Sequence, residues 1–223
     1  MKRSFVLILT IALTVILIAP VRAGSILQSA HHDFYIEPGA SSFQEYIGLN
    51  FDSFDDQGQT RILDAVSISY SINAEAHVTV ENDMDYLMDT VSVTSTVHLD
   101  IDNFGQASHV DMYSEEGGIG LDQTDYITGS GPDFYDFGIL TIDGQGYYDT
   151  TSDFSIFTGS GPLQLVFDGS ANYSLGGMWS PIFIVSDLAA SMNVSLTYEY
   201  SVVPEPSTVL LFGMATMVLK RRK

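Results

Sequence analysis

The sequence predicts an all-β protein: an antiparallel β-sandwich of jelly-roll type, flanked by an N-terminal signal helix and a short C-terminal hydrophobic helix. Three observations lead to this prediction. Apolar and polar residues alternate with a period of two in several long segments, and glycine- and aspartate-rich clusters separate these segments. Between the two apolar ends of the chain, no window has helical periodicity. Residues 24–202 are expected to form one domain, long enough to bury a core.

The chain begins with features of a secretory signal peptide, which we place at residues 1–23. Lys2 and Arg3 precede an apolar run over residues 5–19, and the small residue Ala23 stands before Gly24. The apolar run is shorter than the roughly 18 residues of a spanning helix, which favours a cleaved signal over a retained anchor. Signal peptidase is expected to cut between Ala23 and Gly24.

The central part of the chain is expected to contain roughly ten strands, with a long strand at each end of the domain. Period-2 alternation, typical of strands with one buried face, occupies residues 66–72, 76–80, 91–99 and 190–202. Shorter apolar runs occur at residues 139–142, 154–157, 163–167 and 182–185. Breaks between strands are predicted at residues 55–58, 117–118 and 176–177, where Gly and Asp gather.

The charge balance of this central part excludes nucleic acid as a partner. It keeps 27 of the 28 acidic residues, since only Glu205 lies in an end segment, and a single cation, Arg61, which gives a charge of −26. Such a surface repels the phosphates of nucleic acids and anionic lipids. The chain has no cysteine, which excludes a disulfide scaffold and thiol chemistry.

Residues 203–223 have the organisation of a sorting signal. A proline-containing break is followed by an apolar run over residues 209–219 and a basic end over residues 220–223; the break consists of Val203, Pro204, Glu205, Pro206, Ser207 and Thr208. As a helix, the apolar run would reach only about 20 Å even if Ser207 and Thr208 join it, against roughly 30 Å of bilayer hydrocarbon. It is therefore expected to anchor the chain transiently in the inner membrane, with the basic end inside and the domain outside.

This order of features resembles the PEP-CTERM sorting signal of Gram-negative exopolysaccharide producers; Leu210-Leu211, Gly213 and Arg221-Arg222 share in the resemblance. The resemblance implies that an exosortase, a membrane-embedded cysteine protease or transpeptidase, recognises the motif and cuts near Pro204-Glu205-Pro206. Glu205 would then be a recognition residue in a substrate. The protein would pass to the cell surface or extracellular matrix. The alternative is an ordinary short tail anchor.

The central domain is similar to the choice-of-anchor E domain, a secreted β-rich module found before different surface-anchoring signals. The resemblance rests on Phe43, Phe54-Asp55, Leu63, Val66, the segment His-Val-Thr-Val-Glu-Asn at residues 77–82, and residues 157–161 and 194–200. Ile62-Leu63-Asp64 departs from the Leu-Thr or Leu-Gly expected before the first paired strand. No activity comes with this family, so the resemblance implies a role class without a mechanism.

Acidic residues offer candidate metal ligands and candidate catalytic acids. The densest groups are Asp52, Asp55 and Asp56; Glu81, Asp83, Asp85 and Asp89; Asp100, Asp102 and Asn103; and Glu115 with Glu116. Asp100, Asp102 and Asn103 resemble the start of a calcium-binding loop, although Phe104 stands where a ligand belongs. A solvated acidic surface is the alternative. A carboxylate pair could also serve a glycosidase, but among so many acids a pair alone identifies nothing. The five His lack a zinc-site spacing.

Aromatic pairs and a repeated turn are the remaining candidate features. Residues 134–137 and 147–149 place adjacent rings on strands, so one ring of each pair should be exposed and available to stack on sugar. The alternative places these rings in the core. Thr-Gly-Ser-Gly-Pro occurs at residues 128–132 and again at 158–162. It predicts either paired loops at one end of the sandwich or two independent turns of similar composition.

These features together favour a non-enzymatic exported protein with a structural or adhesive role in exopolysaccharide or biofilm. Its expected partners are exosortase, signal peptidase and extracellular polysaccharide. No cofactor is expected, apart from a calcium ion at the weak candidate site. The alternatives are a secreted carbohydrate-active hydrolase that uses a carboxylate pair and a calcium-dependent carbohydrate-binding module.

Overall fold

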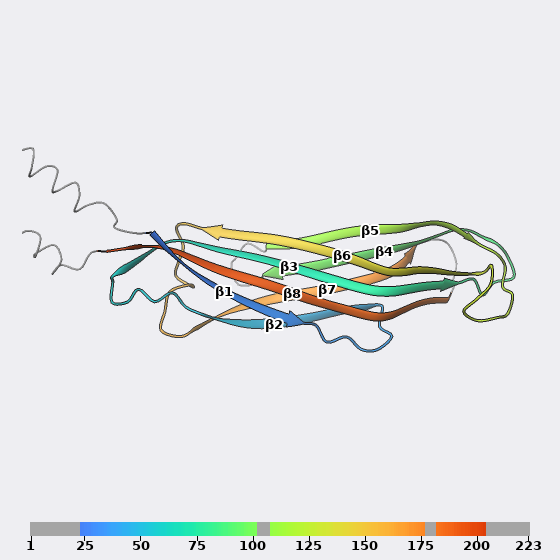
Figure 1. Ribbon diagram of the computed structural model, residues 1–223, viewed down its shortest axis with the longest axis horizontal. Coiled ribbons are helices and arrows are strands. Elements are labelled where there is room, and N and C mark those ends of the chain that lie inside the picture. Colours follow the sequence, from blue (N-terminus) through green and yellow to red (C-terminus); the bar gives the residue numbers. More distant parts are fainter. Residues whose placement is uncertain (1–22, 102–107, 177–181, 204–223) are drawn as a thin grey trace, which may run out of the picture.

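The computed structural model describes residues 23–101, 108–176 and 182–203, and all regular structure in these ranges is β (Figure 1). The predicted signal helix and C-terminal helix lie outside the described residues. The strands are β1 (Ala23–Asp33), β2 (Ser42–Asp52), β3 (Arg61–Glu81), β4 (Met88–Ile101), β5 (Ser108–Leu121), β6 (Phe134–Thr150), β7 (Pro162–Gly176) and β8 (Ile182–Val202).

The eight strands form two four-stranded sheets, ordered β1-β8-β3-β6 and β2-β7-β4-β5. Every neighbouring pair within the sheets is antiparallel. Successive strands change sheet at every connection except the one between β4 and β5. Eight strands divided in this order between two antiparallel sheets form a jelly roll, which confirms the predicted β-sandwich.

The core lies between the sheets because alternate residues of the long strands are apolar. On β3 the inward positions are fully or almost fully buried; they are Val66, Ile68, Tyr70, Ile72, Ala74, Ala76, Val78 and Val80. The facing sheet contributes Leu165, Phe167 and Tyr173 of β7. Two buried phenols keep hydrogen bonds: Tyr173 donates to Leu140 O at 3.1 Å and Tyr198 donates to Asp52 O at 3.0 Å. Both rings can therefore lie in the core with their hydroxyls satisfied.

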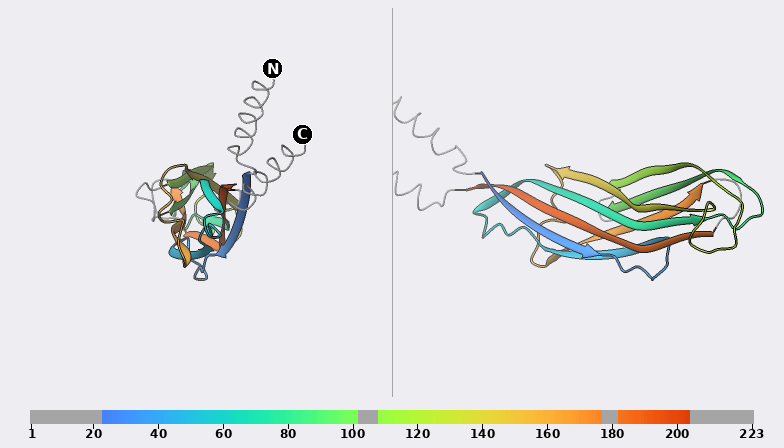
Figure 2. Two further views of the ribbon diagram at one scale, coloured as in Figure 1. Left: turned by 90° about the vertical axis from the view of Figure 1, so that its left-hand side faces the viewer. Right: turned by 45° about the vertical axis from the view of Figure 1, so that its right-hand side comes forward.

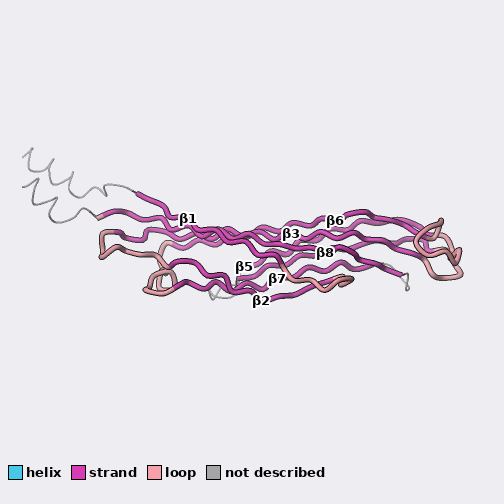
Figure 3. The backbone as a smooth tube through the Cα atoms, turned by 60° about the horizontal axis from the view of Figure 1, so that its bottom comes forward, coloured by secondary structure: helices cyan, strands magenta, loops and turns pink. Residues whose placement is uncertain are grey.

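The body is elongated because its central strands are long. β3 and β8 each have 21 residues, which corresponds to roughly 65 Å of extended chain. Figure 3 shows most of the loops at the two ends of this body. β8 is a central strand, hydrogen-bonded to β1 on one edge and to β3 on the other.

Several predicted boundaries were wrong. Residues 66–72 and 76–80 belong to one strand, as do 182–185 and 190–202, so eight strands replace the expected ten. In β8 an irregularity opposite Glu75 and His77, with Asp187 at a φ of 55°, replaces the expected break. Residues 154–157 form a turn. The predicted break at residues 117–118 lies inside β5, where Gly117 pairs with Ser92 of β4 and Gly118 stands at an irregularity in the pairing.

Candidate functional site

The first and last residues that the structure describes, Ala23 and Val203, lie at one end of the sandwich. β1 begins with Ala23 opposite Ser201, and β3 begins with Arg61 opposite Val202. Val203 N donates to Thr60 O at 2.8 Å. Figure 2 shows the start of β1 and the end of β8 together at this end, which we call the exit end. The cleavage between Ala23 and Gly24 stays a prediction, as do cleavage at Pro204-Glu205-Pro206 and the recognition role of Glu205, since residues 204–223 lie outside the described part.

Tyr200 organises the side chains of the exit end. A Cβ added at Gly24 would lie 2.6 Å from the Tyr200 ring, so only glycine allows this close approach. On the same ring the Arg61 guanidinium lies 4.8 Å from the centroid, a cation–π contact. The only Lys or Arg of the described chain is thus held beside the predicted signal-peptide cut.

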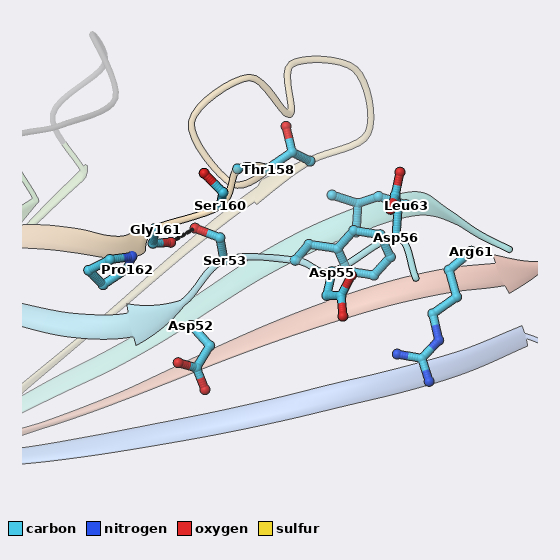
Figure 4. A pocket seen from close by; sticks show the side chains of 12 residues that line it. Asp52, Ser53, Asp55, Asp56, Arg61, Leu63, Thr158, Ser160, Gly161 and Pro162 are labelled. Carbon is cyan, nitrogen blue, oxygen red and sulfur yellow. Dashed lines mark hydrogen bonds between the residues drawn. The ribbon is translucent and has the colours of Figure 1, made fainter. Parts of the chain in front are cut away.

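An open hollow of about 890 Å³ lies at the exit end, between the segment after β2 and the segment before β7. Ser53 Oγ donates to Gly161 O at 2.6 Å, and Phe54 N donates to Phe157 O at 2.8 Å, which joins the two segments. Phe54 itself is buried against Tyr198 and Tyr200. In Figure 4 Arg61 stands at one side of the hollow and Pro162 at the other.

The carboxylates of this hollow serve local structure. Asp55 Oδ1 accepts from Gln57 N at 2.8 Å and Asp56 Oδ1 from Gly58 N at 3.0 Å, which closes the turn before β3. The predicted break at residues 55–58 is confirmed as this turn. Asp52 is fixed through its backbone, which exchanges two hydrogen bonds with the Gln28 side chain. The hollow therefore presents acids whose positions follow from turn formation.

The opposite end, which we call the distal end, consists of the loops at residues 82–87 and 122–133 and the strand ends beside them. Fully buried Asn82 joins these loops: its Nδ2 donates to Tyr86 O at 2.7 Å and to Asp122 O at 2.6 Å. Its backbone N donates to Asp133 O at 2.8 Å. Because every one of these partners is a backbone carbonyl, the Asn82 side chain fixes the loops irrespective of their own side chains.

The distal end exposes aromatic rings. Tyr126 is 82% exposed and donates its hydroxyl to Asp85 Oδ1 at 2.8 Å; Tyr86 and Tyr135 are also exposed. The predicted pairing of an exposed with a more buried ring is confirmed on β6, where Tyr135 and Tyr147 are exposed while the adjacent Phe134 and Tyr148 are half-buried. The two pairs lie at opposite ends of β6, so they do not form one platform.

The weak calcium candidate divides between described and undescribed residues. Asp100 lies on β4, and its Oδ2 pairs with His98 Nε2 at 2.9 Å. Asp102 and Asn103 lie outside the described residues, so the site stays a prediction. Among the described residues, no group of three or more His, Cys, Asp or Glu side chains is placed to hold a metal ion.

The repeated Thr-Gly-Ser-Gly-Pro turns do not pair. Residues 128–132 precede β6 at the distal end, whereas residues 158–162 follow it and line the hollow at the exit end. The prediction of paired loops was wrong, because a strand of 17 residues separates the two turns. The second prediction, independent turns of similar composition, describes them correctly.

Hydrogen bonding and burial shift several pKa values. Burial, followed by the Asp52 carboxylate, raises the pKa of Tyr198 to about 12. A hydrogen bond from Gly138 N and a second from His77 lower the pKa of Asp136. Hydrogen bonds with Asn193 and Asp33 raise the pKa of His31, which lies in β1.

Sequence reasoning missed Asn82, Asp125 and Asp133, which shape the distal end. Asp133 stands directly before β6 and is fully buried, although aspartate is rarely buried without a partner. The only signal in the sequence was that three aspartates, Asp122, Asp125 and Asp133, flank two glycines. That signal is weak in a chain with 28 acidic residues.

The described part of the chain contains no helix with the length and apolar character needed to cross a membrane. No curated protein matches the chain. Among solved structures, the chain is similar to a bacterial lipoprotein from Bacteroides thetaiotaomicron, with 9% identity over 80% of this chain and 84% of that one and a TM-score of 0.18. It also resembles the VP2 subviral particle of infectious bursal disease virus, with 11% identity, 92% and 50% coverage and a TM-score of 0.16. TM-scores below 0.5 do not inform the fold or the function.

A family model described as the PEP-CTERM protein-sorting motif matches residues 202–223. The match begins at the last residue of β8, so the motif follows the sandwich without an intervening linker. It confirms the resemblance noted for residues 203–223. The chain thus carries a PEP-CTERM motif at its carboxyl end, which marks an exported protein with a C-terminal membrane-anchoring signal that is sorted by exosortase.

Proposed function

We propose that this protein is a non-enzymatic component of the cell surface or extracellular matrix, with a structural or adhesive role in exopolysaccharide or biofilm. Signal peptidase and exosortase would process the chain at its exit end, where it is transiently anchored in the inner membrane. The distal end would contact matrix polysaccharide. Arg61 is the only Lys or Arg of residues 24–202, so the protein would not bind nucleic acid.

The observation that carries this proposal is the separation of the two ends. The first and last strands of the described domain meet at the exit end, where Ala23 pairs with Ser201, and the exposed rings of Tyr86 and Tyr126 lie at the distal end. β3 joins these ends over 21 residues, or roughly 65 Å. A protein anchored by its tail would therefore hold these rings well away from the membrane. Exposed rings on loops held by a rigid scaffold are typical of binding surfaces.

The test is retention of the purified exported protein by matrix polysaccharide from the producing bacterium. We expect Tyr126→Ala and Tyr86→Ala to reduce retention severalfold, because both rings are exposed at the distal end. Tyr147→Ala is the matched control, since Tyr147 is 60% exposed near the other end of β6. The proposal fails if the wild-type protein is not retained and deletion of its gene leaves the matrix unchanged.

The second candidate is a carbohydrate-active hydrolase, favoured by the hollow that holds Asp52, Asp55 and Asp56 at the exit end. Glycoside hydrolysis needs two carboxylates flanking the bond to be cut. The purified protein can be incubated with matrix polysaccharide and assayed for new reducing ends. Activity that is lost in Asp52→Asn would establish the hydrolase and overturn the non-enzymatic role.

A further inference from the structure

Asp133, at the distal end, has a carboxylate that the protein leaves half satisfied. The residue is 0% exposed. Its Oδ2 accepts a hydrogen bond from Asp125 N at 2.8 Å, whereas its Oδ1 is buried and has no hydrogen-bond partner. A buried carboxylate costs free energy unless a cation, a proton or hydrogen-bond donors compensate it. The unpaired oxygen therefore indicates a missing partner.

A second carboxylate oxygen faces the same space. A Cβ placed on Gly131 would lie 2.9 Å from Asp133 Oδ1 and closer still to Asp125 Oδ2. Gly131 has a φ of +108°, which side chains rarely adopt, so glycine both permits the turn and leaves this space open. Asp125 Oδ1 is already used, since it accepts from Ile127 N at 2.7 Å. The free oxygens of Asp125 and Asp133 thus converge beside Gly131.

The charges around this space are all negative. Glu81, which is 6% exposed, accepts from Gly129 N in the same loop at 3.2 Å. The only Lys or Arg in the described chain is Arg61, which begins β3, whereas Glu81 ends it 20 residues later. No described cationic side chain of that kind can therefore compensate Asp133. Two converging carboxylates and a third nearby favour an external cation.

We propose that the distal loop binds a divalent cation of the calcium class between Asp125 Oδ2 and Asp133 Oδ1. Calcium takes six to eight hard oxygen ligands in flexible geometry, so carbonyl oxygens and water would complete its shell. With only two carboxylates in contact, we expect a dissociation constant on the order of 0.1–1 mM, as in extracellular calcium modules. This site is separate from Asp100, which lies on β4 and pairs with His98.

Bound calcium would hold together the two parts of the loop that contain Asp125 and Asp133. Asp125 and Asp133 are joined by a hydrogen bond, and Asp133 O also accepts from Asn82 N in the neighbouring loop. A cation held by both carboxylates would therefore stabilise the loop that presents Tyr126. The inference does not rest on polysaccharide binding, because the cation site can be measured in the absence of any sugar.

The test is calcium binding by the purified exported protein, measured by thermal unfolding and by terbium luminescence excited through tyrosine. We expect calcium to raise the Tm of the wild-type protein over the chelator-treated sample, and calcium to displace terbium from one site. Asp133→Asn and Asp125→Asn should each weaken terbium binding at least about tenfold, since each removes half of the contacting charge. Both variants should also lose the calcium-dependent rise in Tm.

Asp149→Asn is the matched control, because it makes the same change at an exposed position near the far end of β6. It should bind terbium as the wild type does.

If Asp133 is instead protonated, calcium will leave the wild-type Tm unchanged and Asp133→Asn will unfold at the wild-type temperature, which overturns the proposal. Equal terbium binding by Asp125→Asn, Asp149→Asn and the wild type would overturn it too, because the bound ion would then be elsewhere. If Asp133→Asn does not fold, terbium binding and the calcium-dependent Tm of Asp125→Asn test the proposal.

Discussion

The two ends of the sandwich contain similar residues and use them differently. At the exit end, Asp55 and Asp56 are exposed and accept backbone hydrogen bonds that close a turn. At the distal end, Asp133 is buried with an unpaired oxygen. The exposed carboxylates remain hydrated, so their cost is small, whereas burial makes the Asp133 charge depend on a partner. Burial, more than composition, therefore distinguishes a structural aspartate from a candidate ligand.

The largest expected difference between the ends concerns their cores. Phe157, at the exit end, is 0% exposed and packs against Tyr198 within the main core. Leu121, at the distal end, belongs to a small cluster with Val80 and Val91. Phe157→Ala should cost about 3–5 kcal/mol, whereas Leu121→Ala should fall near 2 kcal/mol, at the low end of its class, because a small cluster relaxes more easily. Urea denaturation measures both, and equal losses would contradict the difference.

Removal of Asn82 should have the next largest effect. Asn82→Ala leaves the carbonyls of Tyr86 and Asp122 without their donor and Met84 N without its acceptor, in part-buried positions. The expected loss is about 2–3 kcal/mol, from three hydrogen bonds and the desolvated groups left behind. Asn73→Ala is the control, since Asn73 makes one exposed hydrogen bond with Asp143 and should lose less than about 1 kcal/mol. A similar loss of stability in both variants would mean that the hydrogen bonds of Asn82 contribute no more than the single exposed one of Asn73.

Alanine substitution of two glycines tests whether the space beside Gly131 must stay open. Gly58, in the exit-end turn, has a φ of +71° with no atom within 4 Å of an added Cβ, whereas at Gly131 an added Cβ would contact two carboxylates. Gly58→Ala should cost about 1 kcal/mol from backbone strain alone. Gly131→Ala should cost about 2–3 kcal/mol, because steric displacement adds to the strain. Thermal unfolding compares the two variants, and an equal shift in Tm would show that the space beside Gly131 can be filled.

Exposed carboxylates near each end should give the smallest effects. Hydrogen bonds from Gly138 N and His77 lower the pKa of Asp136, and hydrogen bonds from Ser155 lower that of Asp153. A lowered folded-state pKa means that each contribution to stability is present above the ordinary value of 3.8 and is lost as the pH falls through the folded value. Asp136→Asn and Asp153→Asn should therefore differ from the wild type well above pH 3.8 and approach it as the pH falls below that value. A constant difference across this range would exclude titration as the cause.

The sequence predicted best those parts in which one residue pattern determines one structure. The alternation over residues 66–72 and 76–80 could only bury one face of a strand, and both runs lie in β3, which buries that face. A long strand was expected at the start of the domain, but its bounds were not predicted, because the half-buried positions of β1 hold Gly24, Gln28 and His32 among apolar residues, as an edge strand permits. The glycines at residues 117–118 were interpreted as a break because the pairing of β5 with β4, which continues on both sides of an irregularity at Gly118, is not a local property of the sequence.

The distal cation site could not be predicted for a different reason. Asp125 and Asp133 are two of many acids, and nothing in the sequence places them together. Their convergence depends on the positive φ of Gly131, and the burial of Asp133 depends on the loop that Asn82 holds beside it. The C-terminal motif is the opposite case, since a sorting enzyme reads the linear sequence itself and residues 202–223 match the family model directly.

The central position of β8 determines how the sandwich would respond to mechanical tension. β8 leads to the C-terminal anchor and is hydrogen-bonded along both edges, to β1 and to β3. Tension between that anchor and a ligand at the distal end would act along the strand, whereas its ladder hydrogen bonds lie across it. The bonds on both edges would then resist shear together, instead of breaking one after another as in an edge strand peeled from its end. A tether attached through β8 would thus resist pulling better than one attached through an edge strand.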